Sequence, residues 1–263
     1  ARALTDTCHV DNVVEGILMT SATNLTIGGT AAGAGNTISN GLGDGIHALL
    51  GAFTGTVVQG NTITANARDG IRLNQATALT VGGTAVAAAN TVTKNGEDVI
   101  HAVVGDDAGT AIHGNVVQAN VRDGIHLVQA THLAVGGAAA GEGNTSSANL
   151  SDGIHVIAGD YTGTTIQGNL VEANLDDGIH INAATNLAVG GLGNTIQKNA
   201  VNGVHVSAGD YTGSKVGGNT VQANGASGLR LDNARNLLVG VTEANVFEAN
   251  AVGVTAIGTL TGT

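Results

Sequence analysis

Apolar and polar residues alternate along this chain in short stretches that Gly, Asn and Asp interrupt. GIHLV at 124–128, TTIQG at 164–168 and NLVEA at 169–173 are three such stretches, rich in β-branched and aliphatic residues. A period of two over four or five residues predicts a β-strand with one buried face. The chain is therefore expected to be built from many short strands rather than from helices.

The alternating stretches recur in phase over the whole chain. Neighbouring copies of an Asp-Gly-Ile-type element lie 25 or 29 residues apart, and two columns of asparagine follow the same spacing. The first column contains Ile17, Ile46, Ile71, Ile100, Ile125, Ile154, Ile179, Val204, Leu229 and Val254. The asparagine columns contain Asn36, Asn61, Asn90, Asn115, Asn144, Asn169, Asn194, Asn219 and Asn245, and Asn66, Asn95, Asn120, Asn149, Asn174, Asn199, Asn224 and Asn250.

This repeat predicts an all-β solenoid. Three short strands per unit give about ten coils of 25 to 29 residues in a single domain over residues 1–263, without a capping helix. Equivalent residues of neighbouring coils should lie about 4.8 Å apart in parallel sheets. The repeated N-x-x-x-D-G-I-x-L and G-N-T elements resemble the parallel β-helix repeats of the pectin-lyase-like families, of the kind found in bacterial and archaeal surface proteins. That resemblance implies a right-handed solenoid.

Alternation assigns the two faces of each strand. In DGIHL at 123–127, Ile125 and Leu127 should point inward, and His126 should point outward. The asparagines flank turns, where Asn tolerates left-handed backbone and its amide can bond to the Asn of the next coil. We interpret both asparagine columns as structural ladders.

The outward position forms a stripe along the solenoid. It is occupied by Leu18, His47, Arg72, His101, His126, His155, His180, His205, Arg230 and Thr255. An aspartate column, including Asp98, Asp123, Asp152 and Asp177, lies three residues earlier in each coil. Three residues of strand separate each Asp from its own His by about 10 Å, which predicts two parallel but unconnected stripes.

Four interpretations of the histidines stay open. An exposed residue copied with its repeat is one, and a pH-responsive surface is another, in which stacking lowers the imidazole pKa values below about 6.5. Opportunistic Zn, Cu or Ni binding would use His101, His126, His155, His180 and His205, and no other cofactor is expected. Catalysis is the fourth, but it needs a base, an acid and a charge-neutralising group at one place, and this stripe is regular.

A second candidate site lies on a turn that recurs in alternate coils. The copies are GAFTGT at 51–56, GDDAGT at 105–110, GDYTGT at 159–164 and GDYTGS at 209–214, and Leu260 takes the aromatic place in the last copy. Phe53, Tyr161, Tyr211, Asp160 and Asp210 are predicted to form either a glycan contact or a lateral contact in a fibre.

Composition narrows the classes of partner. The formal charge is −11 with nine Lys and Arg, which argues against nucleic acid. Cys8 is the single cysteine, so neither an intrachain disulfide nor a multi-Cys metal site is possible. The chain has no apolar run long enough to span a membrane. We expect an extracellular or cell-surface location.

The two ends of the chain fall at almost the same phase of the repeat. We therefore predict a non-catalytic structural solenoid that stacks head to tail with itself into an extracellular filament, or that forms part of a longer adhesin stalk. The alternative is a carbohydrate-active enzyme or a glycan-binding module of the pectin-lyase-like fold, with polysaccharide as its partner.

Overall fold

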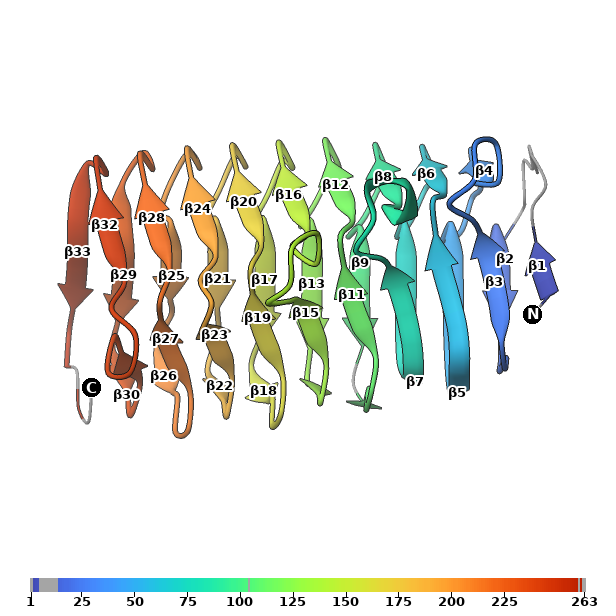
Figure 1. Ribbon diagram of the computed structural model, residues 1–263. Helices are drawn as coiled ribbons and strands as arrows, with labels where there is room; N and C mark the ends of the chain where they lie inside the picture. Colours follow the sequence, from blue (N-terminus) through green and yellow to red (C-terminus); the bar gives the residue numbers. More distant parts are fainter. Residues whose placement is uncertain (1, 5–13, 104, 260, 262–263) are drawn as a thin grey trace.

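Three short strands follow one another in each coil of the computed structural model, which describes residues 2–4, 14–103, 105–259 and 261. Successive coils lie side by side from β1 to β33 and form a right-handed parallel β-solenoid of about ten coils (Figure 1). The predicted fold class is confirmed. Over the described ranges, the 3₁₀ turn η1 (Val86–Ala88) is the only helical segment.

The strands fall into three rows that run along the solenoid. The first row, which carries the Asp-Gly-Ile-His elements, consists of β2 (Ile17–Met19), β5 (Ile46–Gln59), β7 (Ile71–Gly82), β9 (Ile100–Val103), β13 (Ile125–Val128), β17 (Ile154–Ile157), β21 (Ile179–Ile181), β25 (Val204–Val206), β29 (Ser227–Asp232) and β33 (Val252–Ile257). The second row consists of β1 (Arg2–Leu4), β3 (Leu25–Gly28), β11 (Ala111–His113), β15 (Ala134–Gly136), β19 (Thr165–Gln167), β23 (Ala188–Gly190), β27 (Lys215–Gly217) and β31 (Leu238–Val239), and β5 and β7 extend into it.

The third row carries the Gly-Asn-Thr elements. It consists of β4 (Thr37–Ser39), β6 (Thr62–Thr64), β8 (Thr91–Thr93), β12 (Val116–Gln118), β16 (Thr145–Ser147), β20 (Leu170–Glu172), β24 (Thr195–Gln197), β28 (Thr220–Gln222) and β32 (Val246–Glu248). Two-residue strands pair at the corner between the first and second rows: β10 (Gly105–Asp106) with β14 (Ala130–Thr131), β18 (Gly159–Asp160) with β22 (Ala184–Thr185), and β26 (Gly209–Asp210) with β30 (Ala234–Arg235).

Pairing between coils keeps the predicted register. Ile125 pairs with Ile100 on one side and Ile154 on the other, and all three side chains are fully buried. The next residues along, His101, His126 and His155, are likewise paired and lie on the outer face. The faces predicted from the alternation are therefore correct.

Both asparagine columns form continuous amide ladders. In the first, Asn115 Nδ2 donates to Asn144 Oδ1 at 3.0 Å, and Asn144 Nδ2 donates to Asn169 Oδ1 at 3.0 Å. The second amide hydrogen of Asn144 goes to the Ile112 carbonyl at 2.8 Å. Asn120 and Asn149 are bonded in the same way in the other column. The ladders satisfy buried polar groups at two corners of every coil, so the structural interpretation is confirmed.

Two positions from the sequence discussion, Cys8 and Leu260, lie outside the described residues.

Candidate functional site

The histidine stripe is a stack of nearly parallel imidazole rings on the outer face of the first row. From His101 to His205, successive ring centroids lie 4.8, 5.1, 4.9 and 4.6 Å apart, with interplanar angles of 5 to 7°. Arg72 precedes the stack and Arg230 follows it in the same register. Each ring shields its neighbours, which leaves these five side chains between 14 and 21 % exposed.

The aspartate column lies directly beside the stack at the corner of each coil. From Asp98 to Asp177, Oδ1 of the aspartate accepts the backbone N–H of the equivalent residue in the next coil, as in Asp152 N to Asp123 Oδ1 at 2.9 Å and Asp177 N to Asp152 Oδ1 at 2.9 Å. These side chains are almost fully buried. One oxygen of each carboxylate is thus fixed by the backbone, and the other faces the imidazoles.

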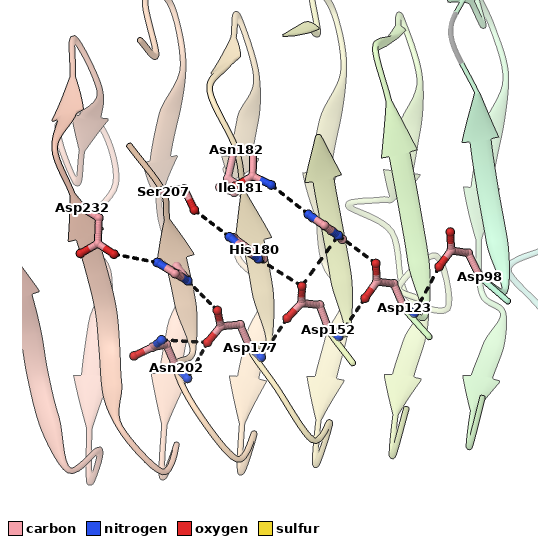
Figure 2. A network of polar contacts seen from close by, with 12 residues as sticks. Asp98, Asp123, Asp152, Asp177, His180, Ile181, Asn182, Asn202, Ser207 and Asp232 are labelled. Atoms are coloured by element: carbon pink, nitrogen blue, oxygen red, sulfur yellow. Dashed lines mark hydrogen bonds and ion pairs between the residues drawn. The ribbon is translucent and has the colours of Figure 1, made fainter. Parts of the chain in front are cut away.

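The two stripes are connected, which corrects the prediction that they are separate. Each histidine places Nδ1 against Oδ2 of the aspartate in the preceding coil (Figure 2). The distances are 2.9 Å for His101–Asp69, 2.8 Å for His155–Asp123, 3.2 Å for His180–Asp152 and 2.7 Å for His205–Asp177, and His126 is bonded to Asp98 in the same way. We call this set of paired aspartates and histidines the Asp–His ladder.

The prediction failed because it measured distance along one strand. The chain bends at the residue after each Asp, which is Gly in most coils and Val99 after Asp98. The carboxylate is therefore not part of an extended segment and turns toward the stack. His155 Nδ1 lies 3.9 Å from Oδ2 of its own-coil Asp152, well below the separation expected for strand geometry. The closer partner, Asp123, comes from the neighbouring coil and is distant in sequence.

The neighbour of the second imidazole nitrogen, Nε2, differs from coil to coil along the ladder. His155 Nε2 lies 3.0 Å from Asn182 Nδ2, and His180 Nε2 lies 2.8 Å from Ser207 Oγ. His205 Nε2 lies 3.1 Å from Asp232 Oδ2. At the equivalent position facing His126 the residue is Ile157, and the buried Nε2 of His126 has no hydrogen-bond partner.

Pairing raises the pKa values of His155 and His205, opposite in direction to the lowering expected from stacking. Burial opposes protonation of His155, but the hydrogen bond to Asp123 and the charge of nearby aspartates outweigh it. The hydrogen bond to Asp177 is the largest influence on His205 and raises its pKa. Despite burial, these bonds lower the pKa values of Asp123 and Asp177.

The aromatic turn is not a surface site, which corrects the second predicted site. Phe53, Tyr161 and Tyr211 are fully buried. Tyr161 Oη lies 2.8 Å from the Leu127 carbonyl and accepts the Gln129 N–H at 3.0 Å, so the ring closes a corner of the core. No aromatic surface for a sugar or a second fibre is presented there.

The aspartates of that turn do lie at the surface. Asp160 Oδ1 accepts hydrogen bonds from the Thr162 N–H, the Thr162 hydroxyl and the Asn186 amide. Asp210 repeats this arrangement with Thr212 and Asn236. Both carboxylates stabilise their own turns, and their predicted contact with a ligand stays a prediction.

Two buried titratable groups were not anticipated. Asp107 occupies the turn position of Tyr161; its Oδ1 accepts the Ala76 N–H at 3.1 Å, its Oδ2 has no partner, and burial raises its pKa to about 7. His113, on β11, has a buried Nδ1 without a partner, and burial lowers its pKa. The alignment of GDDAGT with GDYTGT already carried a signal that Asp107 points inward.

The Asp–His ladder also supplies the donor atoms of a metal site. Four groups, each with one aspartate and two histidines, have ligand atoms within 4.8 Å of one another. They are Asp98, His101 and His126; Asp123, His126 and His155; Asp152, His155 and His180; and Asp177, His180 and His205. Imidazole nitrogen with carboxylate oxygen suits Zn²⁺ and Cu²⁺.

No helix in the described part of the chain is long and apolar enough to cross a membrane.

Solved structures show the same fold at low sequence identity. The periplasmic alginate epimerase AlgG and a point mutant of it share 17 % identity with this chain, with TM-scores of 0.52 and 0.53. Each match covers 93 % of this chain and 61 % of the epimerase. The A-module of the Azotobacter vinelandii mannuronan C-5 epimerase AlgE4 shares 15 % identity at a TM-score of 0.47, covering 91 % of this chain and 76 % of the module. These likenesses show the fold alone.

Comparison with family models identifies the family of this chain. A search of curated proteins finds no significant match. Residues 2–139 match the model described as right handed beta helix region, and residues 90–262 match the model described as periplasmic copper-binding protein (NosD). Since each model covers more than half of the chain, this protein belongs to the right-handed β-helix proteins and, within them, to the NosD family.

Proposed function

We propose that this protein is a ligand-binding β-helix that acts outside the cytoplasm and binds a linear acidic polysaccharide along its Asp–His ladder. The observation that carries the proposal is the unbroken outward row from His47 to Arg230, which keeps one polar side chain per coil in register. The location follows the family description and the epimerase, both named as periplasmic.

The spacing of the row suits an extended polymer. One coil advances about 4.8 Å, which is close to the length of one sugar residue in an extended chain. Equivalent side chains on successive coils would therefore meet successive sugars. The aspartates hold the imidazoles in place before a ligand arrives, which reduces the entropy lost on binding.

The positive charges of the outward row favour an acidic polymer as the ligand. Arg72 and Arg230 belong to the same row, and the raised pKa values of His155 and His205 favour imidazolium near neutral pH. The whole chain carries a formal charge of −11, so the cations that can attract an acidic polymer to this face are those of the row itself. Binding should therefore strengthen as the pH falls and the row gains protons.

The row supports binding better than catalysis. A catalytic site of this fold class would bring a base, an acid and a charge-neutralising group to one place. The ladder instead repeats one pair over five coils from His101 to His205. The likeness to an alginate epimerase supports polysaccharide as the ligand class, but it supplies no reaction for these residues.

The filament favoured by the sequence receives less support than polysaccharide binding. The structural relatives named above are polysaccharide epimerases. Head-to-tail stacking and a role in an adhesin stalk stay predictions.

Copper binding is a second candidate function of the same face. The family description names copper, and the ladder offers nitrogen and carboxylate donors that suit Cu²⁺. The observation that favours it is the convergence of one carboxylate and two imidazoles, with ligand atoms within 4.8 Å of one another, in each of the four groups of the ladder.

Alginate binding measured by calorimetry at about pH 5.5 and about pH 7.5 tests the main proposal. Replacing His126, His155 and His180 together with Gln should weaken binding at least about tenfold, since three neighbouring contacts are lost. The matched control is His132→Gln, which changes an exposed histidine outside the ladder. Equal binding by the two variants would contradict the proposal, as would epimerised or cleaved alginate after incubation with the wild type.

A further inference from the structure

We infer that Asp98, His101 and His126 form the first-filled site for one divalent transition-metal ion, and that the ladder as a whole holds at most two such ions. The inference rests on the second candidate function, because it names the residues and the stoichiometry of metal binding on this face. It is independent of whether the face binds polysaccharide.

The upper limit of two ions follows from shared histidines. His126 belongs to the group with Asp98 and to the group with Asp123, and His155 and His180 are shared in the same way. The shared rings of His126, His155 and His180 turn only Nδ1 toward the carboxylates. One nitrogen cannot serve two ions, so neighbouring groups compete and only non-adjacent groups fill together.

The preference for the Asp98 group follows from the second nitrogen of each ring. His155, His180 and His205 are held on that side by Asn182, Ser207 and Asp232. The rings are nearly parallel, so two of them must tilt before both can direct a nitrogen at one ion. His126 tilts without breaking a hydrogen bond at Nε2, because that atom has no partner.

Contacts of the neighbouring rings favour the same group. His205 lies between two carboxylates, Asp177 and Asp232, which hold the ring at both nitrogens. Any group that contains His155 or His205 must break a hydrogen bond at Nε2 before that ring can tilt. The group with Asp98 contains neither residue, so it is the least hindered of the four.

Binding exchanges a proton for the metal ion. The hydrogen bond between His126 and Asp98 holds one proton. A metal–nitrogen bond at Nδ1 of His101 or His126 forms as the N–H bond at that atom breaks. In a neutral ring the proton moves to Nε2, and from an imidazolium ring it leaves to the buffer, so affinity should rise with pH until the ion hydrolyses.

Asp69 is hydrogen-bonded to His101 Nδ1 at 2.9 Å when no ion is present. An ion bound by His101 at that nitrogen displaces this contact too. Asp69 then remains beside the site as a second carboxylate.

Titration of the full chain with CuSO₄, followed by calorimetry and by electron paramagnetic resonance, tests the inference. We expect no more than two bound ions and nitrogen hyperfine structure from two imidazoles. Because protons are released, the heat of binding should differ from one buffer to another. His126→Gln should weaken the first-filled site at least about tenfold. His132→Gln, an exposed histidine 2.9 Å from Asp106, should leave binding unchanged.

Wild-type spectra provide a readout that does not depend on the folding of a variant. Substoichiometric Cu²⁺ should broaden the NMR signals of His101 and His126 before those of His180 and His205. Absence of copper binding would overturn both this inference and the second candidate function. Copper binding that persists unchanged in His126→Gln, or that broadens His132 first, would overturn only the site.

Discussion

At the scale of single residues, the unit of this protein is a histidine bonded to an aspartate of the neighbouring coil. Asp123 and His155, 2.8 Å apart, change each other's pKa in opposite directions. The lowered pKa of Asp123 contributes stability that is present above the ordinary value of 3.8 and is lost as the pH falls through the folded value. The raised pKa of His155 contributes stability that is present below 6.5 and is lost as the pH rises through the folded value.

The pairs Asp123–His155 and Asp177–His205 therefore stabilise the fold most between about pH 4 and about pH 6.5. Burial raises the pKa values of Asp44 and Asp107 to about 6 and about 7, so their contribution is lost as the pH rises from about 4, whereas the lowered pKa of His113 acts in the opposite direction. The melting temperature should be highest at about pH 4 and should be lower above pH 7. Calorimetric melting across this range checks the prediction.

The control for this prediction is the double variant His155→Gln and His205→Gln. Its melting temperature should fall less than that of the wild type as the pH rises. His132→Gln lies outside the ladder and should keep the wild-type profile. A wild-type melting temperature that rises from about pH 6 to about pH 8 would contradict the assigned directions.

At the scale of the strand and turn, the glycine before each inward Ile sets the corner of the coil. A Cβ on Gly153 would lie 2.3 Å from Val171 Cγ1 and 2.7 Å from the Gly178 carbonyl. Gly153→Ala should therefore destabilise the fold by about 1–3 kcal/mol, because neighbouring coils must move apart. Chemical denaturation measures this change.

Gly253 is the matched control for that substitution. It occupies the same corner in the coil of β33, and a Cβ there would meet nothing within 4 Å. Gly253→Ala should leave the free energy of unfolding within about 0.5 kcal/mol of the wild type. An equal loss of unfolding free energy in Gly153→Ala and Gly253→Ala would show that crowding between coils does not cause the destabilisation.

The turn at Asp107 should accept a tyrosine. Tyr161 and Tyr211 fill this position in later coils, and their hydroxyls lie 2.8 and 2.9 Å from the carbonyls of Leu127 and Ile181. Asp107→Tyr replaces a buried carboxyl that has one unpartnered oxygen, so we expect stabilisation by on the order of 2 kcal/mol. Thermal unfolding at neutral pH checks it, and a lower melting temperature would contradict it.

At the scale of the whole molecule, period and alternation were enough to predict the coils, their register and both asparagine ladders. These features depend on residues that recur at a fixed spacing, which the sequence displays directly. The contact between His155 and Asp123 was missed because it joins two coils and depends on the bend after each Asp. The burial of Tyr161 was missed because turn composition does not give the direction of a turn side chain.

The outward row of the first strand row forms one long polar face. The ladder runs along consecutive coils of this row, where its five imidazole rings stack, and Figure 2 shows part of its aspartate contacts. A ligand that follows this face must be extended and must repeat at about the spacing of the coils. A linear polysaccharide has both properties.

NMR titration of the wild-type imidazole nitrogens with an alginate oligosaccharide at about pH 6 tests binding along the ladder directly. We predict that signals from His101, His126, His155, His180 and His205 shift together with one binding constant, and that His132 does not shift. Unchanged ladder signals at saturating oligosaccharide, or shifts confined to His132, would contradict polysaccharide binding at this face.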